Sequence, residues 1–165
     1  MSLNTALIGE LKHESANTRK ILERVPTDKL NWLPHERSMK LGRLAKHIAF
    51  LPAWCGIILN AAEFDFATGK LDNAPPVSTE DILQFFDEKL AAAVKALESA
   101  SDEDLDTMWT VRRGEHIMFQ LPKKVALRSF TYNHIYHHRG QLSVYLRLLN
   151  IPVPGMYGPS ADDTM

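Results

Sequence analysis

The residues with the clearest chemical potential lie near the carboxyl end, where three of the seven histidines fall between positions 134 and 138. His134 and His138 are four residues apart in a stretch that reads as a long helix, so their side chains share one face, one turn apart. Two imidazoles with this spacing can bind one divalent cation, as in helical zinc motifs. His137 lies about 100° further round such a helix and should miss the site.

His47 is the expected third ligand. It falls in the middle of another predicted helix, on the same apolar face as Leu44 and Ile48, and bundle cores commonly build metal sites from facing helices. Three neutral imidazoles leave coordination positions open for water or substrate, which is the pattern of a catalytic rather than a structural site. The alternative is that these histidines are packed core residues whose partners are hydrogen-bonding groups instead of a metal.

Other candidate ligands have weaker support. His13 falls off the apolar stripe of its helix, while His35 and His116 fall in loops or extended segments where we expect them to be solvated. Cys55 is interpreted as a small buried hydrophobe rather than a ligand. Glu14 falls near the apolar stripe of the first helix, where it could either orient an imidazole through a hydrogen bond or lie on a solvated flank.

The residues around the histidines suggest supporting roles. Gly140 costs about 1 kcal/mol relative to alanine inside a helix, which predicts close backbone packing at this point. Gln141 lies within one turn of His138 and could orient it. Trp54 follows His47 by two turns and would line the same pocket, although an ordinary core position is the safer interpretation. No catalytic base is identified, and the chain contains no nucleophile elbow, phosphate loop or dinucleotide fingerprint.

Composition and charge restrict the class of protein. The 165 residues, 45% hydrophobic and 24% charged, predict a single globular domain spanning 1–165. A formal charge of −1 without a basic stripe argues against nucleic acid and anionic membranes as partners. No apolar run approaches about 18 residues, so no membrane span is expected. One cysteine and no recognisable signal peptide predict a cytoplasmic protein.

Four helical segments must position the histidines. They are predicted over about 4–24, 39–63, 79–101 and 123–149, with an irregular loop over 64–77. Pro52 should bend the second helix, and the stretches 107–111 and 116–120 around Gly114 read as a short hairpin or an extended excursion. The pattern predicts an all-α fold, a four-helix bundle with this excursion before the last helix.

Several motifs together resemble the DinB-like (YfiT-related) metal-binding proteins. They are Leu30-Asn31-Trp32-Leu33-Pro34, the stretch from Ser38 through Leu44-Ala45-Lys46-His47-Ile48-Ala49, the string His134-x-x-x-His138-Arg139-Gly140-Gln141-Leu142, and Pro152-x-Pro154 with Tyr157-Gly158-Pro159-Ser160. The resemblance runs nearly end to end. It implies a bundle of up-down-down-up helix order, usually dimeric, with one divalent metal ion held by His47, His134 and His138.

The resemblance also implies a chemistry. Characterised relatives are thiol-dependent transferases and isomerases, so we expect an S-transferase or isomerase-like enzyme that uses a low-molecular-weight thiol and one divalent metal ion, Zn, Ni or Fe. The open metal position could instead serve hydrolysis of a small molecule. A non-catalytic metal- or small-molecule-binding stress-response protein is the alternative. The expected partners are a small-molecule substrate and a second copy of the chain, in a homodimer.

Overall fold

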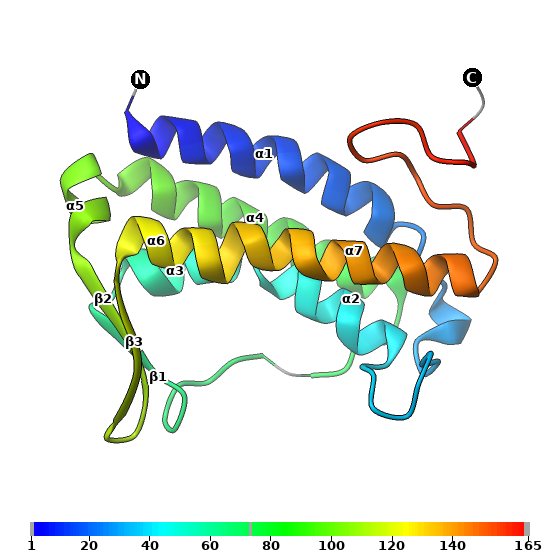
Figure 1. Cartoon of the computed structure of the whole chain (residues 1–165), viewed down its shortest axis with the longest axis horizontal. Coiled ribbons are helices and arrows are strands. Elements are labelled where there is room, and N and C mark those ends of the chain that lie inside the picture. Colours follow the sequence, from blue (N-terminus) through cyan, green and yellow to red (C-terminus); the bar gives the residue numbers. More distant parts are fainter. Residues whose placement is uncertain (1, 73, 164–165) are drawn as a thin grey trace.

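The computed structural model describes residues 2–72 and 74–163, and helices form the larger part of the molecule (Figure 1). The helices are α1 (Leu3–Leu22), η1 (Thr27–Lys29), α2 (Leu41–Phe50), α3 (Ala53–Leu59), α4 (Thr79–Ser99), α5 (Asp102–Asp106), α6 (Lys123–Leu127), η2 (Arg128–Tyr132) and α7 (Asn133–Leu148). The strands are β1 (Glu63–Asp65), β2 (Met108–Arg113) and β3 (His116–Pro122). Within the two described ranges, no helix has both the length and the hydrophobicity that crossing a membrane requires.

The long helices lie close to their predicted positions. Ser78 caps α4, since its hydroxyl accepts a hydrogen bond from the Asp81 amide at 3.1 Å. The second predicted helix is divided between α2 and α3, because Pro52 has no amide hydrogen with which to continue the first of them. The last predicted helix is a continuous helical run from α6 to α7, interrupted only by η2, which is a π-helical turn.

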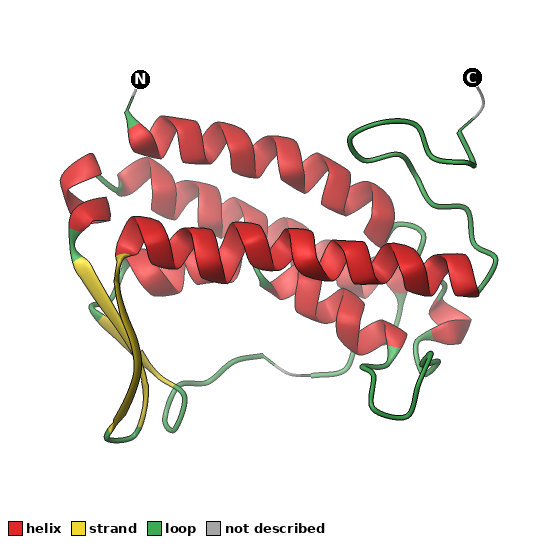
Figure 2. Ribbon diagram, in the orientation of Figure 1, coloured by secondary structure: helices red, strands yellow, loops and turns green. Residues whose placement is uncertain are grey.

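The prediction of an all-α four-helix bundle is wrong, because the chain also forms a three-stranded mixed sheet at one end of the helices (Figure 2). β2 and β3 pair antiparallel as the expected hairpin, with Gly114 in its turn at a φ of 59°. The strand that was not expected is β1, where the sequence predicted the end of the second helix at Glu63 and then a loop. It pairs parallel with β2, Glu63 opposite Thr110, and so completes the sheet.

The hairpin is stabilised by contacts with β1 and with the hydrophobic core. The Oδ1 atom of Asp65 accepts hydrogen bonds from the amides of Ala67 and Gly114, at 2.8 and 2.9 Å, which fixes the end of β1 to the hairpin turn. Trp109 and Val111 of β2 are buried among helical side chains. An isolated two-stranded hairpin would be marginal in water, so this packing explains why the molecule combines helices with a sheet.

Two adjoining clusters of buried apolar side chains form the interior. One joins α1, α3, α4 and α6 to the sheet around Trp54 and Trp109. The other lies between α1, α2, α4 and α7 around Phe86. Phe50, at the end of α2, packs against both clusters. Because α2 and α7 share one core, the side chains on their facing sides are held in fixed relative positions.

Gly140 does not mark close backbone packing, contrary to the expectation from the sequence. It is exposed within α7, and a Cβ atom added there would meet no atom within 4 Å. Gly140→Ala should raise the free energy of unfolding by about 0.5–1 kcal/mol, because alanine loses less backbone entropy on folding. Urea denaturation measures the change. Gly155→Ala is the contrasting variant and should lower the free energy of unfolding, since its Cβ would clash with the Gly158 carbonyl. Unchanged or lower stability of Gly140→Ala would contradict the prediction.

Candidate metal centre

The three histidines predicted as ligands come together between α2 and α7. His47 lies in the last turn of α2, and His134 and His138 lie one turn apart near the start of α7. Leu44 and Ile48 are fully buried and direct one face of α2 into the core, which leaves His47 half-buried at the edge of that face. His138 is the most buried of the three, with 9% of its surface exposed.

The ligand atoms of the three imidazoles are close enough to share one cation. They all lie within 4.8 Å of one another, and the Nε2 atoms of His47 and His134 are 3.3 Å apart. Two nitrogens bound to a tetrahedral zinc ion at about 2.1 Å would be about 3.4 Å apart, so this pair already has a suitable spacing. Within the described ranges, no cysteine or carboxylate joins the cluster. The donor set therefore fits a divalent ion that keeps open coordination positions.

A hydrogen bond to its outer nitrogen orients the imidazole of His138. The Nδ1 atom of His138 lies 2.7 Å from the amide oxygen of Gln141, which can only accept, so Nδ1 carries the hydrogen and Nε2 is left as the ligand atom. The Gln141 amide in turn donates to Nε2 of His137 at 3.1 Å. His134 lies near the start of α7, which follows directly on η2, a π-helical turn of a type frequent at functional sites. The structure thus shows the contact predicted for Gln141.

The surroundings keep these imidazoles neutral. Burial, followed by repulsion from the two neighbouring histidines and from Arg43, lowers the pKa of His47 to about 4. Burial is also the main cause that lowers the pKa of His134 and of His138, although the hydrogen bond to Gln141 partly opposes it at His138. Neutral imidazole is the form that binds metal ions, so the site is prepared for a cation at neutral pH.

The metal-free protein should lose stability as the pH falls below about 6.5. In the unfolded chain His47 takes up a proton near that pH, whereas the folded chain resists protonation down to about pH 4, so acid favours the unfolded state. For this half-buried residue we expect a loss of about 1–2 kcal/mol between pH 6.5 and 4.5. Urea denaturation of chelator-treated protein measures the slope. His47→Gln should flatten it, and an identical slope in the variant would contradict the assignment.

The other candidate ligands lie outside the cluster. Four histidines are exposed, namely His13, His35, His116 and His137. Cys55 is fully buried in the apolar core, and burial raises the pKa of its thiol to about 12, so it stays protonated. Its thiol donates a hydrogen bond to the Thr131 hydroxyl at 3.8 Å. None of these five residues belongs to the histidine cluster, so His13 does not replace His47 there.

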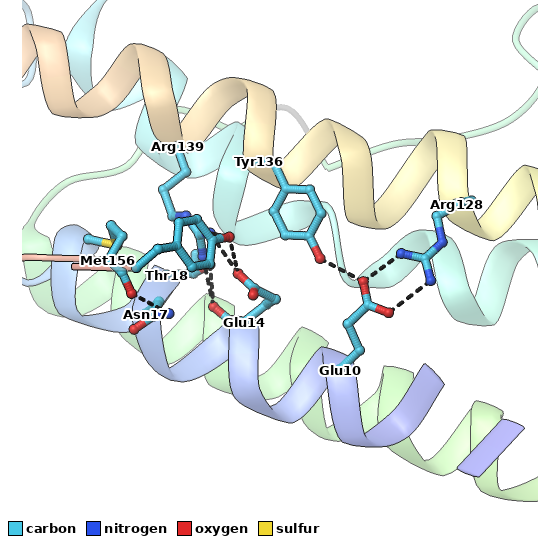
Figure 3. A network of polar contacts seen from close by, with 9 residues as sticks. Glu10, Glu14, Asn17, Thr18, Arg128, Tyr136, Arg139 and Met156 are labelled. Atoms are coloured by element: carbon cyan, nitrogen blue, oxygen red, sulfur yellow. Dashed lines mark hydrogen bonds and ion pairs between the residues drawn. The ribbon is translucent and has the colours of Figure 1, made fainter. Parts of the chain in front are cut away.

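Glu14 does not orient an imidazole, and it does not lie on a solvated flank either. It is buried in α1, where its Oε2 atom accepts a hydrogen bond from Arg139 at 2.6 Å (Figure 3). Arg139 also donates to the Glu14 carbonyl at 3.0 Å and to the Thr18 hydroxyl at 3.2 Å. The Tyr157 hydroxyl donates to the same carboxylate at 2.7 Å. This network ties α7 to α1 and to the C-terminal segment at the residue next to His138.

The histidine cluster opens into a cavity of about 1100 Å³. His47 and His134 line this cavity together with the aromatic rings of Phe50, Trp54 and Phe130. Trp54 therefore lines the cavity and also belongs to the buried core, which was the safer interpretation from the sequence. A volume of this size, with apolar walls and a few converging polar groups, is typical of sites for small organic molecules.

Comparisons with known proteins agree with this architecture. The uncharacterised protein YrdA of Bacillus subtilis (strain 168) is 30% identical over 154 residues, which cover 91% of this chain and 85% of that protein. A solved DinB-like protein from Bacillus cereus ATCC 10987 is similar with a TM-score of 0.69 and 26% identity, over 90% of this chain and 94% of that one. The DinB-like protein YjoA of Bacillus subtilis shares the fold, with a TM-score of 0.69 at 20% identity over 89% of this chain and 96% of its own.

The family assignment rests on the length of the match as well as on the motifs. The sequence model of the DinB family matches residues 1–164, which include all three clustered histidines. On this match over nearly its whole length, the chain belongs to the DinB family.

Proposed function

We propose that this chain is a divalent-metal-dependent S-transferase that uses a low-molecular-weight thiol, with His47, His134 and His138 as the metal ligands. The observation that carries the proposal is a cluster of three imidazoles without a fourth side-chain ligand in the described ranges. Two of the three, His47 and His134, line a cavity of about 1100 Å³. Open coordination next to space for an organic molecule is the arrangement of a catalytic metal site.

The cavity residues would bind and orient the reactants. A divalent cation held by the histidines would lower the pKa of a coordinated thiol and so favour the thiolate, the stronger nucleophile. Phe50, Trp54 and Phe130 provide apolar walls that displace water from the body of a bound substrate. In the overall reaction a sulfur–carbon bond forms, the bond from carbon to its leaving group breaks, and the thiol proton passes to solvent.

The nucleophile is expected to come from a co-substrate, because no cysteine is among the described residues that line the cavity. The thiol of Cys55 is buried and protonated, so it cannot attack an electrophile. Among the described residues that line the cavity, Asp72 is the only carboxylate, and it is exposed and accepts a hydrogen bond from the Ala74 amide at 3.1 Å. These observations favour a reaction in which an external thiol is the nucleophile.

Turnover tests the proposal directly. Protein loaded with zinc, nickel or iron would be incubated with cysteine, glutathione or coenzyme A and an aryl halide such as 1-chloro-2,4-dinitrobenzene, with thioether formation followed by absorbance. We expect metal-dependent turnover with at least one thiol, lost in His47→Ala and retained in His137→Ala. The proposal fails if fully loaded protein shows no turnover and no thiol changes the visible spectrum of the cobalt-substituted protein.

A non-catalytic binding role in a stress response is the second candidate. It is favoured by the absence of an available base among the described cavity residues. Under this function the same cavity would bind a small molecule, and metal would raise the melting temperature without any pair of reactants being converted. The turnover panel and a thermal melt with and without zinc therefore separate the two candidates.

A further inference from the structure

The cavity changes character along α2. Beyond the C-terminal end of this helix the wall is aromatic, with Trp54 as its most buried ring, whereas three cations line the cavity on the other side of His47. These cations are Lys40, Arg43 and Lys46. At a rise of 1.5 Å per residue, Arg43 and Lys40 begin about 6 and about 10 Å from His47 along the helix axis. The histidine cluster therefore lies between a cationic end and an aromatic end.

Two of these cations lack a close counterion. Arg43 is exposed at the cavity, and the described residues provide it with no ion pair and no side-chain hydrogen bond. Lys46 is only 9% exposed, its ammonium lies 3.7 Å from the centre of the Phe85 ring, and its nearest carboxylate is Asp81 at 3.9 Å. A largely buried cation at the outer limit of ion pairing is incompletely compensated, so an approaching anion would be attracted to it.

Little else in the cavity wall opposes an anion. Asp72, the only carboxylate among the described lining residues, already accepts a backbone hydrogen bond. The positive end of the α2 dipole lies on the same side as the cations. The first two amides of α2 already donate to the backbone carbonyls of residues 32 and 30, at 2.8 and 2.9 Å. Recognition of an anion here would consequently fall to the side chains rather than to the helix amides.

We propose that Arg43, supported by Lys40 and Lys46, forms an anion subsite, so that the substrates of this cavity include a small molecule with a carboxylate or phosphate at the cationic end. The apolar part of the reactants lies against the aromatic end, and the reacting atom lies between the two, at the histidines. This placement of the reacting atom rests on the proposed function, whereas the binding of the anion requires no metal. The substrate class is therefore a pair of reactants of which at least one carries an anionic group.

Pairs of ligands with one apolar body, of which one member is anionic and the other neutral, test the subsite. 1-Naphthylacetate and 1-naphthylacetamide share one apolar body, as do 1-naphthyl phosphate and 1-naphthol. The affinity of each ligand for chelator-treated protein is measured by calorimetric titration. We expect at least one charged member to bind about 10-fold more tightly than its neutral partner, and the pair with the larger ratio distinguishes carboxylate from phosphate. Arg43→Gln should abolish this ratio without changing the affinity of the neutral ligand, and Arg43→Lys should keep most of it.

The control removes the same charge elsewhere. Arg24 is exposed and does not line the cavity, so Arg24→Gln should keep the wild-type ratio. Raising the salt concentration should reduce the affinity ratio of charged to neutral ligand in the wild type. The reason is that dissolved ions screen the exposed charges of the cavity. Equal binding within both pairs by the wild type, or an unchanged ratio in the Arg43→Gln/Lys46→Met double variant, would overturn the proposal. Since the titrations contain no metal, failure of the metal site would leave these results unchanged.

Discussion

Replacing His47 or His134 with alanine is expected to reduce zinc affinity by at least about 100-fold, because each variant removes one of only three ligands. The ligand atoms of the cluster lie within 4.8 Å of one another, and within the described ranges the cluster contains no fourth cysteine, histidine or carboxylate. Elemental mass spectrometry of tag-free protein should find near one equivalent of metal in the wild type and little in either variant. Competition with a chromophoric chelator gives the affinities.

Two neighbouring residues provide graded controls for this result. His137 is exposed and outside the cluster, so His137→Ala should bind metal as the wild type does. Gln141→Leu should weaken binding by about 10-fold, because it removes the oxygen that fixes the Nδ1 hydrogen of His138. A wild type that takes up no zinc, nickel or iron after reconstitution would contradict the metal site, as would full metal content in His47→Ala.

Metal binding should also be visible in stability. A cation that binds only the folded protein raises the free energy of unfolding by about 2.7 kcal/mol when its free concentration is 100-fold above the dissociation constant. Zinc should therefore stabilise the wild type and leave His47→Ala nearly unchanged. Stabilisation of equal size in both proteins would indicate that zinc binds elsewhere.

The histidine cluster could be predicted from the sequence because it depends on local geometry. A spacing of four residues fixes the relation of His134 to His138 within one helix. His47 could be predicted as the third member because it lies on an apolar helix face, and two such faces must pack against each other. Metal ligation, the thiol substrate and the homodimer stay predictions, because each depends on a molecule other than this single chain.

The features that sequence reasoning missed depend on contacts between distant segments. β1 has three residues, too few for a periodic pattern, and its partner strand begins more than 40 residues later. Gly140 was read as a packing position, but its side of α7 faces open space. The partner of Glu14 was missed because helical periodicity does not show which face of α7 meets α1. One signal in the sequence could have revealed the pair: Glu14 and Arg139 have opposite charges, and each lies near the apolar stripe of its helix.

Glu14→Ala is expected to lower the free energy of unfolding by about 3–5 kcal/mol, because it leaves the guanidinium of Arg139 buried without its counterion. The side chains of this pair are only 9% and 4% exposed, and their closest atoms are 2.6 Å apart. Urea denaturation at neutral pH measures the loss. The matched control is Glu10, which pairs with Arg128 between the same two helical runs (Figure 3) but with side chains 32% and 42% exposed. Glu10→Ala should cost about 1 kcal/mol or less.

The double variant Glu14→Leu/Arg139→Met separates stability from positioning. Well-packed apolar residues can replace a buried ion pair without loss, so this variant should recover most of the stability lost in Glu14→Ala. Arg139 adjoins His138, and its bonds to α1 fix the rotation of α7 at the histidine cluster. Zinc affinity should therefore stay below that of the wild type even when stability returns. A destabilisation by Glu14→Ala no larger than that of Glu10→Ala would contradict a buried pair, and full zinc affinity in the double variant would limit its role to folding.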